Sequence, residues 1–217
     1  FKNWISRYAA VEDYHVVVPL RLEKLAAYIR TEIKADARLE VCADSSPLLE
    51  KLYARYAGLG WLGKNTLLTN EKFGSFVFLG ELITDLELPP DEPAADRCGE
   101  CGRCVQACPT GALVAPRVLN AEICVSYLNK RKGKIAEENK KFIKTSVFGC
   151  DICQNACPWN AGKTEETQSG NTGELFGLLA LAERDFESIA ALSPIEYLGK
   201  ERFLRNRHFP HLLHSFF

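Results

Sequence analysis

Eight of the nine cysteines lie between Cys98 and Cys157, and their spacing restricts the fold of this chain more than any other feature. The first run, CGECGRCVQACP, has the Cys-x2-Cys-x2-Cys-x3-Cys-Pro spacing of bacterial ferredoxins. In those proteins three thiolates bind one iron–sulfur cluster and the fourth binds another. A partner run follows as CDICQNACP, with Cys124 far upstream in the place of its usual first cysteine.

The two runs together predict two 4Fe-4S clusters whose ligands are exchanged between the runs. We expect one cluster on Cys98, Cys101, Cys104 and Cys157, and the other on Cys108, Cys124, Cys150 and Cys153. Two structural zinc sites are the alternative, although zinc knuckles pair Cys-x2-Cys dyads without the Cys-x3-Cys-Pro endings. The remaining Cys42 lies in the apolar segment RLEVCA, which favours a small buried hydrophobic residue over a ligand.

Composition limits the class of protein. The chain has 217 residues, 47% of them hydrophobic, and a net charge of -1, which allows a substantial core in one or two domains. No stretch approaches the roughly 18 consecutive apolar residues of a membrane span, and no leader pattern is visible at the start. We therefore expect a cytoplasmic protein without a membrane partner. Because methionine is absent altogether, we also expect the chain to be a fragment of a longer protein.

The residues before the cysteines have an α/β pattern. Apolar residues at helical spacing predict an amphipathic helix over 21–34, and RLEVCA predicts a strand over 38–43. Ser46 followed by proline predicts the cap of a helix that runs to about Tyr56.

Two apolar runs follow, TLLT and SFVFLGELIT, which predict central strands joined into a hairpin by NEKFG. The proline-rich segment LPPDEPAAD is expected to be a linker between domains. Upstream, GLGWLG matches the Gly-x-Gly-x-x-Gly of dinucleotide sites, but it follows a helix and precedes a strand, the reverse of the order that such a site needs.

The insert between Cys124 and Cys150 is rich in lysine and arginine. Its first basic residues, which we consider for RNA binding, are Lys130, Arg131, Lys132 and Lys134. Such a run is most often a solvated face. Beside a redox centre in a nearly neutral protein it is also a surface where RNA can dock, and both interpretations stay open.

From VCADSSPLLEKLYARYAGLGWLGKN through both cysteine runs to FGCDICQNACPWN, the sequence resembles the epoxyqueuosine reductases, cobalamin-dependent iron–sulfur enzymes of tRNA modification. More distantly it resembles reductive dehalogenases. The similarity runs from DYH, which begins at Asp13, to FLRN, which ends at Asn206. Family members carry a longer N-terminal portion and further helical repeats after FLRN, and the tail RHFPHLLHSFF departs from the family pattern.

The resemblance implies an α+β fold with a cobalamin-binding catalytic domain over 1–92, a ferredoxin-like domain over 93–160 and a short helical segment over 161–217. It implies that the cluster containing Cys108 lies nearer the corrin, while the other cluster faces an external low-potential electron donor. The implied reaction is the two-electron removal of the epoxide oxygen from epoxyqueuosine at the wobble position of tRNA. We expect a monomer.

The resemblance also implies a role for Asp44 in ADSSP, which matches the acidic residue beside the cobalt. We expect Asp44 to be the general acid, with a pKa raised by desolvation in a closed corrin pocket. The alternative is that Asp44 only caps the helix that starts near Pro47. His15 in DYH is expected to be a hydrogen-bonded core or loop residue and not a cobalt ligand.

Further corrin contacts are expected from residues of the glycine-rich stretch and of the apolar runs. Lys64 and Asn65 would bond the corrin amides or phosphate, Leu68 and Leu79 would line its apolar face, and Ser126 would be another contact. Each of these residues has the alternative of ordinary packing or surface polarity.

Two competing functions stay open. A reductive dehalogenase would share the cofactors, but such enzymes usually carry an export leader and a membrane partner. A pure electron-transfer subunit would bind no corrin, and it would need little more than the segment from Arg97 to Trp159.

Overall fold

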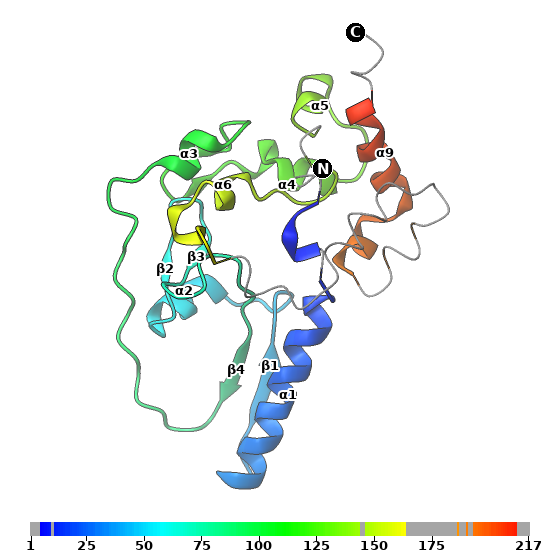
Figure 1. Ribbon diagram of the computed structural model, residues 1–217. Coiled ribbons are helices and arrows are strands. Elements are labelled where there is room, and N and C mark those ends of the chain that lie inside the picture. Colours follow the sequence, from blue (N-terminus) through cyan, green and yellow to red (C-terminus); the bar gives the residue numbers. More distant parts are fainter. Residues whose placement is uncertain are drawn as a thin grey trace.

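The computed structural model describes residues 5–9, 11–143, 146–163, 186, 190 and 193–211, with side chains in the last range as far as Asn206. Helices and short strands are mixed along the chain, as expected for an α+β protein (Figure 1). The expected loop after Ala161 and the histidines of the tail lie largely outside the described residues. In the described ranges, no helix combines the length and the apolar character needed to cross a bilayer.

Helix α1 spans Tyr14–Glu32 and begins earlier than the predicted 21–34 helix. Its N-terminus is set by Asp13, whose side chain accepts a hydrogen bond from the backbone N–H of His15. The helix lies beside an antiparallel pair formed by β1, Leu39–Cys42, and β4, Glu81–Thr84 (Figure 1). The strand predicted over 38–43 is therefore confirmed, and Cys42 within it is buried, as expected.

The predicted hairpin between TLLT and SFVFLGELIT is wrong. β3, Leu68–Thr69, pairs with β2, Trp61–Leu62, while β4 pairs with β1. The chain before β2 approaches β3 so closely that any Cβ on Gly60 would overlap the backbone of Thr69. β2 therefore pairs with the edge of β3 that the run SFVFLGELIT would have needed for the predicted hairpin. NEKFG does form a turn, closed by two backbone hydrogen bonds between Asn70 and Gly74. The strands are also not central, because the described sheets have two strands each.

Helix α2 spans Glu50–Tyr56 and starts later than the Ser46–Pro47 cap predicts. The backbone before it makes tight turns instead, with hydrogen bonds from Ser45 N to the carbonyl of Ala43 and from Leu48 N to that of Ser46. No side chain caps α2. The segment 87–98, which includes the expected linker, has neither helix nor strand and runs as a long loop from β4 to α3 (Figure 1).

The cysteine-rich part consists of short elements that follow one another closely. They are α3 (Arg103–Ala107), β5 (Leu113–Ala115), β6 (Val118–Leu119), a 3-10 turn (Ala121–Ile123), α4 (Val125–Lys130), α5 (Glu137–Ile143), α6 (Ile152–Asn155) and a 3-10 turn (Pro158–Asn160). β5 and β6 form an antiparallel pair with an irregular register. The cysteines therefore lie in loops and at the ends of short helices.

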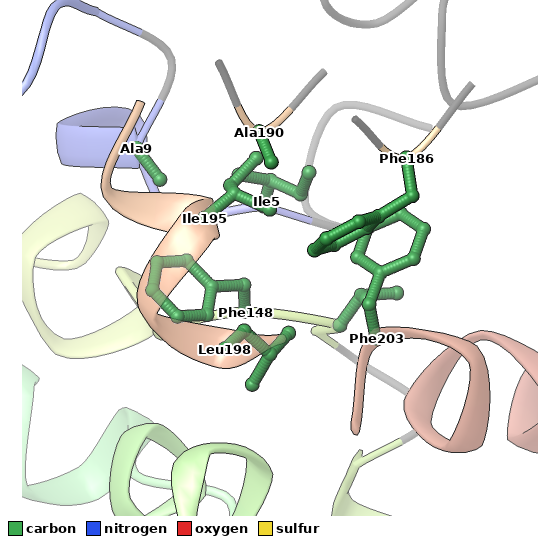
Figure 2. Close-up of a cluster of buried hydrophobic side chains, with 9 residues drawn as sticks. Ile5, Ala9, Phe148, Phe186, Ala190, Ile195, Leu198 and Phe203 are labelled. Carbon is green, nitrogen blue, oxygen red and sulfur yellow. The ribbon is translucent and has the colours of Figure 1, made fainter. Parts of the chain in front are cut away.

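A hydrophobic core joins the two ends of the described chain to the segment before Cys150 (Figure 2). Three of its C-terminal members, Ile195, Leu198 and Phe203, lie on a 3-10 helix, Pro194–Leu198, and on α9, Lys200–His211. Its buried members are Ile5, Ala9, Val147, Phe148, Phe186, Ala190, Ile195, Leu198 and Phe203. Beside this core, Asn206 of α9 donates hydrogen bonds to the carbonyls of Asn129 and Val147. These contacts hold α9 against the cysteine-rich part.

Candidate functional site

Four cysteines from distant parts of the chain line one pocket. They are Cys98, Cys101, Cys104 and Cys157, the four predicted for the first cluster. A backbone hydrogen bond from Cys101 N to the carbonyl of Cys98 folds the loop before α3, and Cys157 directly precedes the last 3-10 turn. The structure thus places Cys157 of the second run beside three cysteines of the first run, as the predicted exchange of ligands requires.

The turn between β2 and β3 forms another wall of this pocket. Gly63, Lys64, Asn65 and Thr69 line it beside the cysteines. Lys64 Nζ donates a hydrogen bond of 2.7 Å to the carbonyl of Gly99, and Arg117 donates from its backbone and side chain to the carbonyls of Lys64 and Leu62. The turn is therefore held against the cysteine loop from two sides.

The second group consists of Cys108, Cys124, Cys150 and Cys153. Burial raises the pKa of Cys150 to about 11 and that of Cys153 to about 12. Cys124 and Cys108 add to both shifts, because thiolates near one another repel. The four predicted ligands of the second cluster therefore lie near enough to one another for their charges to interact.

Both groups have the chemistry that an iron–sulfur cluster needs. Thiolates crowded without a cation are costly, and iron supplies the positive charge that offsets this cost. Among the described residues, no three His, Cys, Asp or Glu side chains converge on a single-ion site. A tetrahedral zinc would draw its sulfur ligands to within about 4 Å of one another, whereas the ligands of a four-iron cluster bind different irons around a wider space. The residues present fit the larger group.

Asp44 lies in the loop after β1 with a left-handed backbone, φ 50°. Its Oδ2 is 3.0 Å from His15 Nε2, and its backbone N–H donates to Glu50 Oε1 at 2.6 Å. Burial raises the pKa of Tyr14, and the nearby charge of Asp44 raises it further. The alternative, in which Asp44 only caps the helix after Pro47, does not fit, because α2 begins at Glu50 and no side chain caps it. Its side chain is 53% exposed, so the described residues alone do not enclose it.

His15 links Asp44 to Asp13. Its Nδ1 lies 2.7 Å from Asp13 Oδ1, so the ring is hydrogen-bonded at both nitrogens, as expected for a structural histidine. Burial lowers the pKa of His15, but the hydrogen bonds to the two carboxylates outweigh it, and the pKa is raised overall. The protonated ring is thus stabilised behind Asp44.

Glu81 and Glu50 form a second pair of carboxyl groups near Asp44. Burial, followed by the charge and hydrogen bond of Glu50, raises the pKa of Glu81 to about 7. As a carboxylate, Glu81 has a buried Oε2 that finds no donor among the described residues; when protonated, it can donate to Glu50. Sequence reasoning missed this pair, although Glu81 is the one acid in the apolar run SFVFLGELIT.

The basic insert is divided by the structure. Lys130, at the end of α4, places its ammonium 5.9 Å from the ring centre of Tyr8. Burial of part of its side chain lowers the pKa of Lys130, and the charges of Cys124 and Asp44 act in the opposite direction, although the residue is exposed. Arg131, Lys132 and Lys134 are exposed and remain available for the predicted RNA contact. The insert's later Lys144 lies outside the described residues.

The other predicted corrin contacts are spread over the molecule. Leu68 is buried in β3, Leu79 is half-buried before β4, and Ser126 lies in the first turn of α4. Lys64 and Asn65 line the first cysteine pocket. Their contact with a corrin stays a prediction.

Two family models match the chain. Residues 97–160 match a 4Fe-4S double cluster binding domain, and residues 2–45 match a model described as Epoxyqueuosine reductase QueG, DUF1730. Among curated relatives, the epoxyqueuosine reductase of Pseudomonas aeruginosa is 44% identical, over 94% of this chain and 59% of its own length. That of Escherichia coli K12 is 41% identical, over 94% and 56%. The chain therefore spans less than two thirds of these relatives.

The solved structures that resemble this chain are also epoxyqueuosine reductases. An epoxyqueuosine reductase crystallised with a tRNA-Tyr epoxyqueuosine-modified stem loop has a TM-score of 0.85 and 34% identity, over 96% of this chain and 57% of that one. The enzyme of Bacillus subtilis, solved with the catalytic loop of an aspartate swung out of the active site, has 33% identity and a TM-score of 0.85 over the same shares.

Proposed function

Because the chain belongs to the epoxyqueuosine reductase family, we propose that it carries the redox core that reduces epoxyqueuosine to queuosine at the wobble position of a tRNA. The observation that carries this proposal is the position of Asp44, whose carboxyl lies 3.0 Å from His15 Nε2 and whose backbone N–H donates to Glu50, while its side chain stays 53% exposed. The relative solved with a modified tRNA stem loop supports the same substrate class.

The reaction needs electrons and protons in equal number. Breaking both C–O bonds of the epoxide restores a carbon–carbon double bond and releases the oxygen as water, which consumes two electrons and two protons. The two cysteine groups would hold the 4Fe-4S clusters that pass the electrons one at a time. A proton donor must lie beside the epoxide oxygen, and Asp44 is the acid whose side chain is both hydrogen-bonded and open to an incoming ligand.

A corrin is the second cofactor that the family implies. Aromatic rings near Asp44 offer an apolar surface for it: Phe78 stacks on Tyr14 and is 42% exposed, while Tyr197, which lies against His15, is 63% exposed. The residues present therefore fit a large flat ligand. When bound, cobalamin would supply a low-potential cobalt nucleophile for the C–O cleavage.

The chain's own residues would prepare the proton transfer. Asp44 would give its proton to the departing oxygen, and His15, 3.0 Å behind it, would supply a replacement. Asp13 orients the imidazole from the other side, and Glu50 anchors the strained loop through the backbone N–H of Asp44. The catalytic loop of an aspartate that moves in the Bacillus subtilis relative supports a mobile acid at this position.

The exposed part of the basic insert would contact the tRNA backbone. Arg131, Lys132 and Lys134 are exposed beside the second cysteine group's helix α4, and they can neutralise phosphates without base recognition. Lys130 is exposed too, but its ammonium lies 5.9 Å from the ring centre of Tyr8, so it would contribute less than these three.

The test is anaerobic reconstitution with iron, sulfide and cobalamin, followed by an assay on tRNA that carries epoxyqueuosine. We expect about eight irons per chain, a bound corrin and conversion to queuosine measured by mass spectrometry. Asp44→Asn should keep the irons and the corrin but lose turnover by at least a hundredfold. Asp91→Asn, a change at an exposed linker position, is the control and should leave turnover unchanged.

Three outcomes would contradict the proposal. Eight irons with no retained corrin would favour an electron-transfer subunit. A loaded protein that reduces an organohalide but not the tRNA would favour a dehalogenase. Full turnover of Asp44→Asn would remove Asp44 from the role of proton donor.

A further inference from the structure

One buried hydrogen-bond donor at the first cysteine pocket has no acceptor in the described part of the chain. Asn65 is only 5% exposed, and its Nδ2 makes no hydrogen bond to any described residue. The residue lines the same pocket as Cys98, Cys101, Cys104 and Cys157. A buried N–H group without a partner is costly, so its retention in this wall points to an acceptor that occupies the pocket.

The orientation of the Asn65 amide is set by its neighbours. Its Oδ1 accepts a hydrogen bond from Leu67 N at 3.3 Å, so a flipped amide would bring two donors together. A Cβ on Gly63 would lie 2.6 Å from the same Oδ1, which means that the amide is packed against the glycine backbone. The NH2 group is therefore the free end of the amide.

The surrounding turn keeps Asn65 in place. Arg117 holds the carbonyls of Leu62 and Lys64, and Lys64 Nζ holds the carbonyl of Gly99 in the cysteine loop. The turn belongs to the part of the chain that precedes the cysteines, yet it closes a pocket built by both cysteine runs. It thus presents one amide donor and one positive charge to the same four thiols.

We propose that Asn65 Nδ2 donates a hydrogen bond to a sulfur atom of the first 4Fe-4S cluster and thereby raises the reduction potential of that cluster. A cluster gains one negative charge when it accepts an electron, and an N–H group directed at its sulfur stabilises that charge. The positive charge of Lys64 acts in the same direction. Asn65 would thus adjust the reduction potential of the cluster at which electrons enter. This inference rests on the proposed function only because it requires the first cluster to be present.

The experiment is a redox titration of the reconstituted chain, followed by EPR of the reduced clusters. We expect Asn65→Leu, which lacks the donor, to shift one of the two midpoints to a more negative potential. Asn65→Asp keeps an acceptor for Leu67 N but adds a negative charge, and should shift the same midpoint further. A tenfold weaker reduction equilibrium corresponds to about 59 mV for a one-electron couple.

Thr66→Gly is the matched control. Thr66 lies in the same turn with a left-handed backbone, φ 69°, and does not line the pocket. Glycine accepts this backbone, so both midpoints should stay at their wild-type values. Unchanged midpoints in fully loaded Asn65→Leu and Asn65→Asp would overturn the inference, and an equal shift in the control would assign the effect to the turn as a whole and overturn it too.

A second measurement covers the case in which the Asn65 variants do not bind iron. Wild-type chain labelled with 15N-asparagine should show, by pulsed EPR, a nitrogen coupled to a reduced cluster through the hydrogen bond. Absence of this coupling in a loaded protein would overturn the inference while leaving the proposed function intact. A wild-type chain that binds no iron would instead overturn the proposed function. If the coupling appears on cob(II)alamin and not on a cluster, Asn65 is a corrin contact and the inference is wrong.

Discussion

The two cysteine groups have the same ligands and related spacings, but their surroundings differ. The first includes the exposed Cys101 and is closed by a turn that carries Lys64 and Asn65. In the second, all four cysteines are half-buried, and burial raises the pKa of Cys150 to about 11 and that of Cys153 to about 12. Under the proposed function, the exposed thiol of the first group would suit electron entry at the first cluster, with transfer from there to the second.

Replacing one cysteine in each group should have the largest effect and tests whether the two sites differ. Cys153→Ser should abolish the second cluster, reduce the iron from about eight to about four per chain and bring turnover below detection, because the half-buried site loses one of its four thiolates. Cys101→Ser should lose less iron, since its position is exposed. Iron analysis and EPR measure both. Equal losses in the two variants would show that the two sites do not differ in this way.

Two glycines beside the cysteines offer a test of packing. Gly149 precedes Cys150 with φ 68°, and a Cβ there would lie 2.9 Å from the Tyr8 ring and closer still to Ser6. Gly99 follows Cys98 with φ 49°, and a Cβ there would meet nothing within 4 Å.

We expect Gly149→Ala to lower the free energy of unfolding by about 3 kcal/mol, from backbone strain and overpacking together. Gly99→Ala should lower it by about 1 kcal/mol, from strain alone. Urea unfolding followed by circular dichroism gives both values. If the two variants were equally unstable, the second site would be no more tightly packed than the first.

Glu81, in β4 beside Glu50, should make the stability of the chain depend on pH. Its pKa is raised from 4.5 to about 7, so the folded chain keeps a proton that the unfolded chain releases. The free energy of unfolding should therefore fall as the pH rises from about 4.5 through 7, and then level off.

Glu81→Gln should make this fall smaller and leave the part that comes from the raised pKa of His15, while Glu40→Gln, at an exposed position of β1, should leave the whole fall in place. Urea unfolding at a series of pH values between 5 and 8 measures the difference. An unchanged slope in Glu81→Gln would assign the titration to another group.

The smallest effect is expected at the surface of the insert. Lys132→Gln together with Lys134→Gln should weaken tRNA binding modestly and reduce the slope of log K against log salt by about 2, which is about one per lost phosphate contact. Lys24→Gln on α1 serves as the control. Unchanged binding in the double variant would favour the alternative of a solvated face.

The cysteine ligands and the short strand at RLEVCA could be predicted because their signals are local. Metal-ligand spacing and the alternation of a strand are read within about ten residues, and the structure brings together the four cysteines assigned to the first cluster. The start of α1 was also present in the sequence, as Asp13 two residues before His15, but the apolar stripe drew the prediction toward its later turns.

Strand pairing could not be predicted in the same way. Adjacent apolar runs favoured a hairpin, yet β3 pairs back to β2 and β4 pairs with β1, because the glycine backbone of the β2–β3 unit allows a close approach that no pattern of apolar residues reveals. The same applies to Lys130. Within the sequence it is one member of a basic run, and only its position over the ring of Tyr8 separates it from its neighbours.

By itself, the sequence determined which residues can bind metal and which family the chain resembles, because both depend on residue type and spacing along the chain. Tertiary structure alone decided the environment of each group: that His15 and Glu50 hold Asp44, that burial and Glu50 raise the pKa of Glu81, and that Asn65 lines the pocket of four thiols. Such environments arise from contacts between residues far apart in the sequence. Burial and electrostatic coupling depend on distances in space, which the order of residues does not contain.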